Sequence, residues 1–130
     1  MRRMPLLGLL AALVAVGTLA ARAQEQVDPR IAAYDKGPAT IDVSKYPPEM
    51  RTAYKTFSSK CSKCHTLARA INCDFALDEE WERYVKRMMR KPGSDISSAE
   101  GKQIFEFLAY DSKARKKALY DKKLKDAGKP

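Results

Sequence analysis

The chain has 130 residues, of which 25 are basic and 16 are acidic, so its formal net charge is +9 at pH 7. A chain of this length forms one small domain with one hydrophobic core, which excludes a TIM barrel or a two-domain dehydrogenase. After residue 23 no apolar run is long enough to span a bilayer.

Residues 1–23 are predicted to be a secretory signal peptide. Arg2 and Arg3 form a charged start, residues 6–20 form an apolar run, and Ala21-Arg22-Ala23 is a small-x-small cleavage site. Cleavage there leaves 107 residues with 22 basic and 16 acidic side chains. The alternative is an uncleaved N-terminal membrane anchor. In both cases we expect the domain outside the cytoplasm, in the periplasm.

Residues 24–46 are predicted to form an extended N-terminal arm, because they lack a sustained hydrophobic period and contain a glycine and two prolines. The main domain is expected to cover residues 47–111. Its first helix begins at Pro48, since proline suits the first position of a helix, and runs towards Lys60. Four apolar residues share one face of this helix: Met50, Ala53, Tyr54 and Phe57.

A loop is expected over residues 66–77. A second helix then begins near Asp78, because an acidic residue suits a helix N-terminus, and it ends before Pro92. The apolar face of this helix consists of Trp81, Tyr84, Val85 and Met88.

A third helix is predicted to start at the capping box formed by Ser97 and Glu100. A fourth, weakly amphipathic helix is expected over residues 112–126, within a basic C-terminal segment of residues 112–130. No alternating strand pattern is present, so the sequence predicts an all-α domain.

Basic residues are concentrated near the C-terminus. Residues 111–130 carry eight Lys or Arg and three Asp, a net charge of +5. This charge has three interpretations: a solvated helix end, electrostatic steering towards an acidic partner, or attraction to an anionic membrane surface. Nucleic acid is not expected as a partner, because the protein is predicted to be exported and its basic segment lacks interleaved aromatic residues.

The pentapeptide Cys61-Ser62-Lys63-Cys64-His65 has the C-x-x-C-H pattern that attaches c-type haem. The spacing lets the two thiols add to the two vinyl groups on one side of the porphyrin, while the next residue brings an imidazole to the iron as the proximal ligand. Export fits this chemistry, because bacterial haem attachment of this kind takes place outside the cytoplasmic membrane. His65 is the only histidine, so a second histidine ligand and a second haem of this type are excluded.

Two other interpretations of the cysteines compete with haem. A redox-active C-x-x-C pair belongs to a βαβ context, which is missing here. A zinc site built from Cys61, Cys64, His65 and Cys73 needs adjacent residues on two corners of one tetrahedron, whereas zinc motifs separate such pairs by two or more residues. Cys73, the odd cysteine, is predicted to be a buried thiol near the haem, with an intermolecular disulfide or a reactive thiol as alternatives.

Methionine is the remaining soft ligand for the other face of the iron. Met50 lies on the helix that leads into the pentapeptide and is interpreted as core. Met88 shares the apolar face of the second helix with Trp81, whereas Met89 lies about 100° further round. We therefore predict Met88 as the distal ligand and Met89 as the alternative. A third interpretation is that both side chains only pack in the hydrophobic core.

Over residues 47–111 the chain resembles small monohaem class I c-type cytochromes. A helix leads into C-x-x-C-H, a methionine follows in the C-terminal half, and a helix with aromatic residues closes the domain. The segment from Trp81 to Met88 is similar to the W-x-x-x-V-x-x-M segments of cytochromes. The resemblance implies a cytochrome c-like helical domain around one covalently attached haem c, with close crossing of the first and last helices. Gly101 is expected to permit that approach at Ala53.

The chain departs from this family after the haem histidine. These cytochromes often carry a proline there whose carbonyl orients the imidazole, and this chain has no proline between Pro48 and Pro92. The acceptor for the second imidazole nitrogen is therefore not predicted. Trp81 and Arg69 are candidate hydrogen-bond donors to the haem propionates. The structural alternatives are that Trp81 is an aromatic residue of the core and that Arg69 is exposed to solvent.

A His/Met haem has no open iron position and exchanges one electron through an exposed edge. The sequence therefore predicts a periplasmic electron carrier, soluble or as the electron-transfer subunit of a redox complex, with acidic redox proteins as partners. It does not predict an enzyme in its own right. If neither Met88 nor Met89 binds iron, the alternative is a five-coordinate haem protein that binds small ligands or serves a peroxide- or sulfur-oxidising enzyme.

Overall fold

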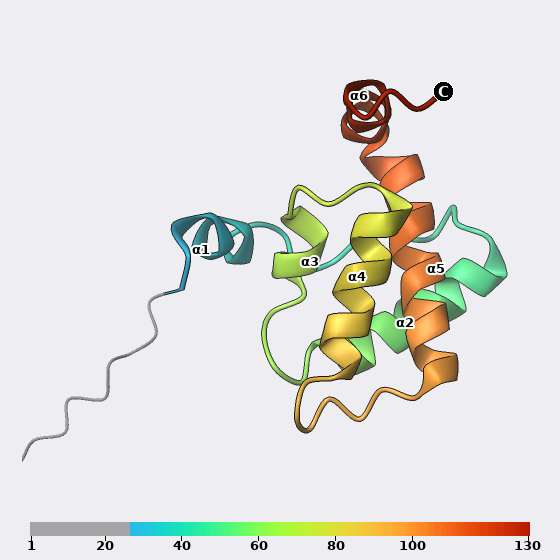
Figure 1. The fold of residues 1–130 in the computed structure, drawn as a ribbon. Coiled ribbons are helices and arrows are strands. Elements are labelled where there is room, and N and C mark those ends of the chain that lie inside the picture. The colour runs from blue at the N-terminus through green and yellow to red at the C-terminus, as the bar shows by residue number, and fades with distance from the viewer. Residues whose placement is uncertain (1–26) are drawn as a thin grey trace, which may run out of the picture.

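The computed structural model describes residues 27–130, and this part of the chain is all-α and contains no strand, as predicted. It forms six helices (Figure 1): α1 (Pro29–Asp35), α2 (Pro48–Cys61), α3 (Ala68–Asn72), α4 (Asp78–Met89), α5 (Ser98–Arg115) and α6 (Lys117–Asp126). The predicted signal peptide and its cleavage site lie outside the described residues. Over the range 27–130 no helix has the length and apolar character needed to cross a membrane.

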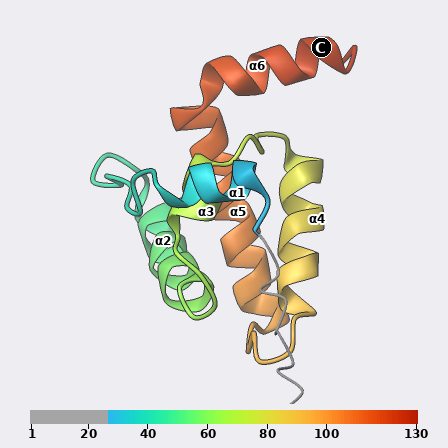
Figure 2. The same ribbon diagram turned by 90° about the vertical axis from the view of Figure 1, so that its left-hand side faces the viewer.

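Helix α5 is the centre of the hydrophobic core. It packs against both α2 and α4, and Figure 2 shows it between these two helices. The rings of Phe57 on α2 and Phe107 on α5 are fully buried, with their centroids 5.4 Å apart. Trp81 on α4 is 1% exposed and joins the same cluster, so one continuous core connects α2, α4 and α5, the three longest helices of the described residues.

Helix α2 confirms the helix predicted from Pro48, and it ends on Cys61, the first residue of the pentapeptide. Its buried residues are Ala53 and Phe57. Phe57 lies four residues before Cys61, so the two side chains project from the same side of the helix. Burial of Phe57 therefore fixes the direction in which the first thiol points.

Two of the helix starts predicted after the pentapeptide, at Asp78 and at Ser97, are confirmed. Helix α4 begins at Asp78, and the Glu80 carboxylate accepts hydrogen bonds from the backbone N–H groups of the two residues before the helix, at 2.8 and 2.9 Å. At the start of α5, the Ser97 hydroxyl accepts the Glu100 N–H at 3.2 Å, and the Glu100 carboxylate accepts the Ser97 N–H at 2.9 Å. These contacts satisfy N–H groups that a helix start leaves without partners.

The predicted helix start at Ser112 is wrong, because α5 continues to Arg115. Asp111 and Ser112 are polar and yet buried, since each has a partner inside the protein. The Asp111 carboxylate accepts a hydrogen bond from the Tyr46 hydroxyl at 2.8 Å. The Ser112 hydroxyl accepts the Trp81 indole N–H at 2.8 Å. Both polar residues thus make interior contacts of one continuous helix.

Two short helices occur where the sequence predicts none. Helix α1 lies in the predicted extended arm, and α3 lies in the loop expected over residues 66–77. Asp28 caps α1 by accepting the Arg30 N–H at 2.8 Å. The two helices pack against each other, and Arg69 of α3 donates to both carboxylate oxygens of Asp35, at 3.0 and 2.7 Å. Each helix is too short to show a period, and contacts between distant parts of the chain stabilise both.

The basic C-terminal segment folds back onto the domain, and Figure 2 shows α6 across the N-terminal end of α4. Three acidic residues in the first turn of α4 pair with lysines of the C-terminal segment, at 2.6 to 2.9 Å: Asp78 with Lys113, Glu79 with Lys129 and Glu80 with Lys123. Lys116 donates to two backbone carbonyls of residues 73 and 75. Most of the +5 charge of this segment is therefore neutralised or bonded within the chain.

We expect Ser112→Ala to lower the free energy of unfolding by about 2 kcal/mol, because it leaves the buried Trp81 indole N–H without an acceptor. The control is Ser98→Ala at the exposed start of the same helix, which should change stability by less than about 0.5 kcal/mol. Urea denaturation measures both values. Equal effects of the two substitutions would contradict the assigned role of Ser112.

Candidate functional site

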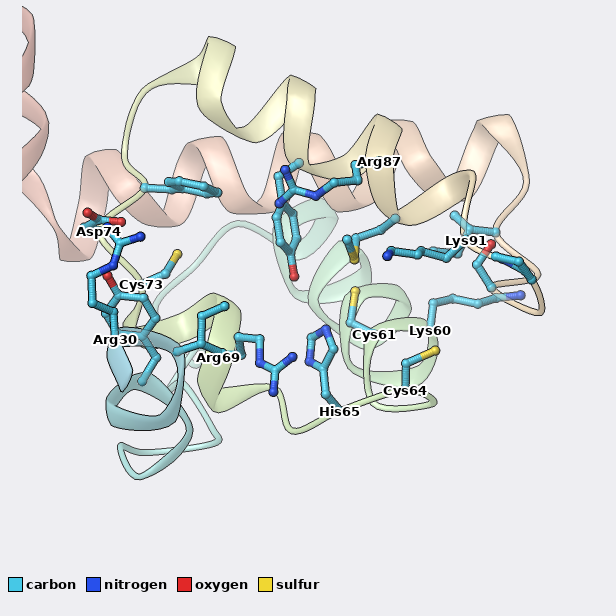
Figure 3. Close-up of a pocket in the computed structure, with 18 residues that line it drawn as sticks. Arg30, Lys60, Cys61, Cys64, His65, Arg69, Cys73, Asp74, Arg87 and Lys91 are labelled. Atoms are coloured by element: carbon cyan, nitrogen blue, oxygen red, sulfur yellow. The ribbon is translucent and has the colours of Figure 1, made fainter. Parts of the chain in front are cut away.

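A cavity of about 740 Å³ lies beside the core, within the range of roughly 300–1,000 Å³ that is typical of ligand pockets. Its walls come from α1, the end of α2, residues 64–75, α4 and the loop over residues 91–96. The structure brings four of the predicted site residues to this one cavity: Cys61, Cys64, His65 and Met88. Figure 3 shows His65 on one side of the cavity and α4, with Arg87, on the other.

The two cysteines of the pentapeptide differ in their surroundings. Cys61 is partly buried at the last turn of α2, and Cys64 is exposed in the turn that follows. Burial, with a smaller contribution from the nearby Cys64, raises the pKa of Cys61 to about 12. The first thiol thus faces the interior of the cavity, whereas the second lies at its solvent-exposed edge.

His65 has an acceptor for one ring nitrogen in the backbone itself. Its Nδ1 lies 3.0 Å from the carbonyl oxygen of Thr66. A carbonyl oxygen only accepts hydrogen bonds, so Nδ1 carries the proton in this contact, and in a neutral ring Nε2 has the free lone pair. Such a bond fixes the tautomer and the orientation of a histidine that binds metal. The contact supplies the acceptor that the sequence does not reveal.

The two methionines of α4 point to different places. Met88 lines the cavity, whereas Met89 packs against α5. A Cβ atom at Gly101 would lie only 2.5 Å from the Met89 sulfur. The absence of a side chain at Gly101 thus makes room for Met89, and the expected approach of Gly101 to Ala53 is wrong. Of the two candidate ligands, only Met88 lines the cavity that His65 also lines.

Cationic side chains dominate the polar part of the cavity wall. Five basic residues line it against one acidic residue, Asp74: Arg30, Lys60, Arg69, Arg87 and Lys91. Three of the five pair with carboxylates elsewhere, whereas Arg87 and Lys91 have no carboxylate partner within residues 27–130. This balance favours an anionic ligand.

Tyr84 places a buried polar group without a hydrogen-bond partner in the cavity wall. The residue is 7% exposed, and its hydroxyl has no hydrogen-bond partner in the described part of the protein. Burial raises the pKa of Tyr84, so the hydroxyl stays protonated and is available as a hydrogen-bond donor. The Arg87 guanidinium lies 5.5 Å from the centre of the Tyr84 ring. Tyr84 and Arg87 together therefore offer hydrogen bonds and positive charge to a ligand.

Of the two predicted propionate donors, the structure favours only Arg69. The Trp81 indole N–H is used by Ser112 inside the core, and Trp81 does not line the cavity, so its assignment as a donor is wrong. Arg69 does line the cavity. Asp35 accepts two of the five N–H groups of its guanidinium, which leaves donors for another group.

The sequence missed Tyr84 as a site residue. It was identified only as part of the apolar face of the second helix, although it lies one turn before Met88 on that face. This spacing is the signal that indicates a shared environment. For the α1 residues Arg30, Ile31 and Tyr34 no comparable signal exists, because only the tertiary fold brings them to the cavity.

Cys73 is a buried thiol that lines the same cavity, in line with its prediction. Its sulfur lies 3.2 Å from the Ala70 carbonyl oxygen, to which the thiol donates. Burial raises the pKa of Cys73, and the nearby Lys116 ammonium offsets part of this effect. The surroundings therefore disfavour the reactive thiolate form.

The zinc alternative has no preformed site. Within residues 27–130, no group of three or more His, Cys, Asp and Glu side chains is placed so that it could hold a metal ion. The four candidate zinc ligands all belong to this part of the chain, and they share the cavity without forming such a group.

Comparison with known proteins gives no match: no family model fits the sequence, and no curated protein or solved structure is significantly similar to the chain. The residues of the cavity and their geometry are therefore what indicates a function.

We expect iodoacetamide at pH 8 to label Cys73 much more slowly in the native protein than in urea, because burial shields the sulfur and raises its pKa. At that pH a smaller fraction of Cys73 is thiolate in the folded protein than in the unfolded chain. Mass spectrometry of peptides taken at timed intervals measures the rate. Equal rates with and without urea would show that the thiol is accessible.

Proposed function

We propose that the protein is a c-type haem protein that carries single electrons outside the cytoplasm, in the periplasm. The observation that carries the proposal is the convergence of four residues on one cavity: Cys61, Cys64, His65 and Met88. They come from the end of α2, the turn after it and α4, so the convergence is a property of the fold as well as of the motif.

The residues of the cavity fit this cofactor. Cys61 and Cys64 are free thiols at one end, where thioether bonds to the two vinyl groups would form. His65 has its Nδ1 occupied by a backbone carbonyl, which leaves Nε2 for the iron. Met88 offers a thioether sulfur from α4. This set of donors is the one found in cytochromes with His/Met ligation.

The polar groups of the cavity fit the remaining part of such a cofactor. Tyr84 has a buried hydroxyl without an internal acceptor, and Arg69 and Arg87 add positive charge. A carboxylate that accepts a hydrogen bond from the Tyr84 hydroxyl would remove the free-energy cost of burying this hydroxyl unpaired. Haem carries two such carboxylates as its propionates.

Electron transfer follows from the ligand set. Iron with both axial positions filled exchanges electrons without binding substrate, and methionine ligation raises its reduction potential. His65 is held by Thr66, and Met88 is held on a helix whose neighbouring residues Trp81 and Val85 are in the core. Ligands fixed in this way move little between oxidation states.

Two exposed cations of the cavity wall support docking of an acidic redox partner. Arg87 and Lys91 are exposed, line the cavity and have no carboxylate partner in the described residues. The C-terminal segment is a weaker candidate for steering, because most of its cations are bonded within the chain. We therefore place the steering charge at the mouth of the cavity.

We expect Met88→Ala to lower the reduction potential and to let reduced protein bind carbon monoxide, because the iron loses its sulfur ligand. Met89→Ala, which changes a neighbouring side chain that packs against α5, should leave both properties unchanged. Redox-titrated visible spectra with and without carbon monoxide measure these effects. If reduced wild-type protein lacks c-type bands, the proposal fails. If it already binds carbon monoxide rapidly, the five-coordinate haem protein is the better description.

Charge substitutions test the docking surface. We expect the double variant Arg87→Ala/Lys91→Ala to slow electron exchange with an acidic flavoprotein about threefold or more at low salt and to weaken its salt dependence. The control Lys122→Ala/Lys125→Ala removes two cations from α6 and should have little effect. Stopped-flow absorbance measures the rates. A larger effect of the α6 variant would return the steering role to the C-terminal segment.

A further inference from the structure

Helix α1 contributes directly to the cavity, although its residues lie outside the region that resembles cytochromes. Arg30, Ile31 and Tyr34 of α1 line the wall. Figure 3 shows Arg30 beside Asp74 and Cys73, at the end of the cavity away from Cys64 and Lys91. The first helix thus closes the end opposite the attachment cysteines.

Polar contacts with α3 hold α1 in this position. Among residues 27–130, helix α1 packs against no helix other than α3, and none of its residues is buried. Its anchors are the paired hydrogen bonds from Arg69 to Asp35 and the Asn72 amide, which donates to the carbonyls of Tyr34 and Pro38 at 3.1 and 2.9 Å. A helix of seven residues does not persist in water without such support.

The chain approaches α3 so closely at Gly37 that a side chain there is excluded. A Cβ atom at this position would lie 2.4 Å from the Asn72 side-chain nitrogen. Residue 37 therefore has to be glycine for the Asn72 amide to reach both carbonyls. Since α3 begins three residues after His65, these contacts tie α1 to the segment that carries the proximal ligand.

Ile31 and Tyr34 face the cavity and are half-buried. Ile31 is not among the residues that pack against the core cluster, so the apolar side of α1 has no core partner at this position. Arg30 adds a cation next to them. An apolar face with a cation at its edge matches a flat macrocycle that carries carboxylates on the side opposite its thioether bonds.

We propose that α1 forms one wall of the cofactor site. Ile31 and Tyr34 pack against the edge of the haem, and Arg30 faces its carboxylates. Helix α1 stays folded because both α3 and the cofactor hold it in place. This inference rests on the proposed function. It extends the site to residues 28–38, a segment that the sequence assigns to an extended arm.

Hydrogen–deuterium exchange of residues 27–38 in the haem-loaded full-length protein tests the inference. Alanine is a better helix former than isoleucine, so Ile31→Ala strengthens a helix that merely lies on the surface. If Ile31 instead packs against the cofactor, the same substitution weakens docking and exchange becomes about fivefold faster or more. Asp35→Ala should also speed exchange, and Asp42→Ala, an exposed acidic residue outside the cavity, should not.

The outcomes separate the inference from the function on which it rests. Faster exchange in both Ile31→Ala and Asp35→Ala, with unchanged exchange in α5, supports the proposal. Unchanged or slower exchange in Ile31→Ala overturns it, even if Asp35→Ala loosens α1. The absorbance spectrum of the same sample reports haem, and its absence from the wild-type protein overturns the proposed function and this inference together.

Discussion

The site depends on how the core fixes the end of α2. Phe57 is fully buried against Phe107 of α5, and Cys61 follows one turn later at the last position of the helix. Each residue of a helix turns by about 100°, so a shift of one position would direct Cys61 away from the cavity. The spacing of the pentapeptide then places Cys64 and His65. Packing of one phenylalanine thus orients the groups on which the proposed chemistry depends.

Helix α4 has opposite charges at its two ends, and each end has its own role. The acidic first turn binds lysines of the C-terminal segment and suits the positive end of the helix dipole. The basic last turn lies beside the mouth of the cavity, where Arg87 and Lys91 are exposed. The C-terminal segment therefore stabilises one end of α4, and the other end remains available for an anionic ligand and an acidic partner.

Local patterns in the sequence predicted the parts of the fold that they determine. Pro48, Asp78 and the capping box at Ser97 mark the starts of three helices, and all three are confirmed. Cys61, Cys64, His65 and Met88 all line one cavity, and their role as haem ligands stays a prediction. What the sequence did not predict depends on contacts between distant residues, such as Arg69 with Asp35 for α1 and α3. The sequence left two roles open for Trp81 for the same reason, because Ser112, the partner that holds its indole in the core, is 31 residues away.

Tandem mass spectrometry of the peptide that contains residues 61–65, from protein purified from its natural host, tests the central claim most directly. We predict that this peptide carries the mass of one haem, bound through the sulfur atoms of Cys61 and Cys64. Detection of the unmodified peptide alone would contradict the account.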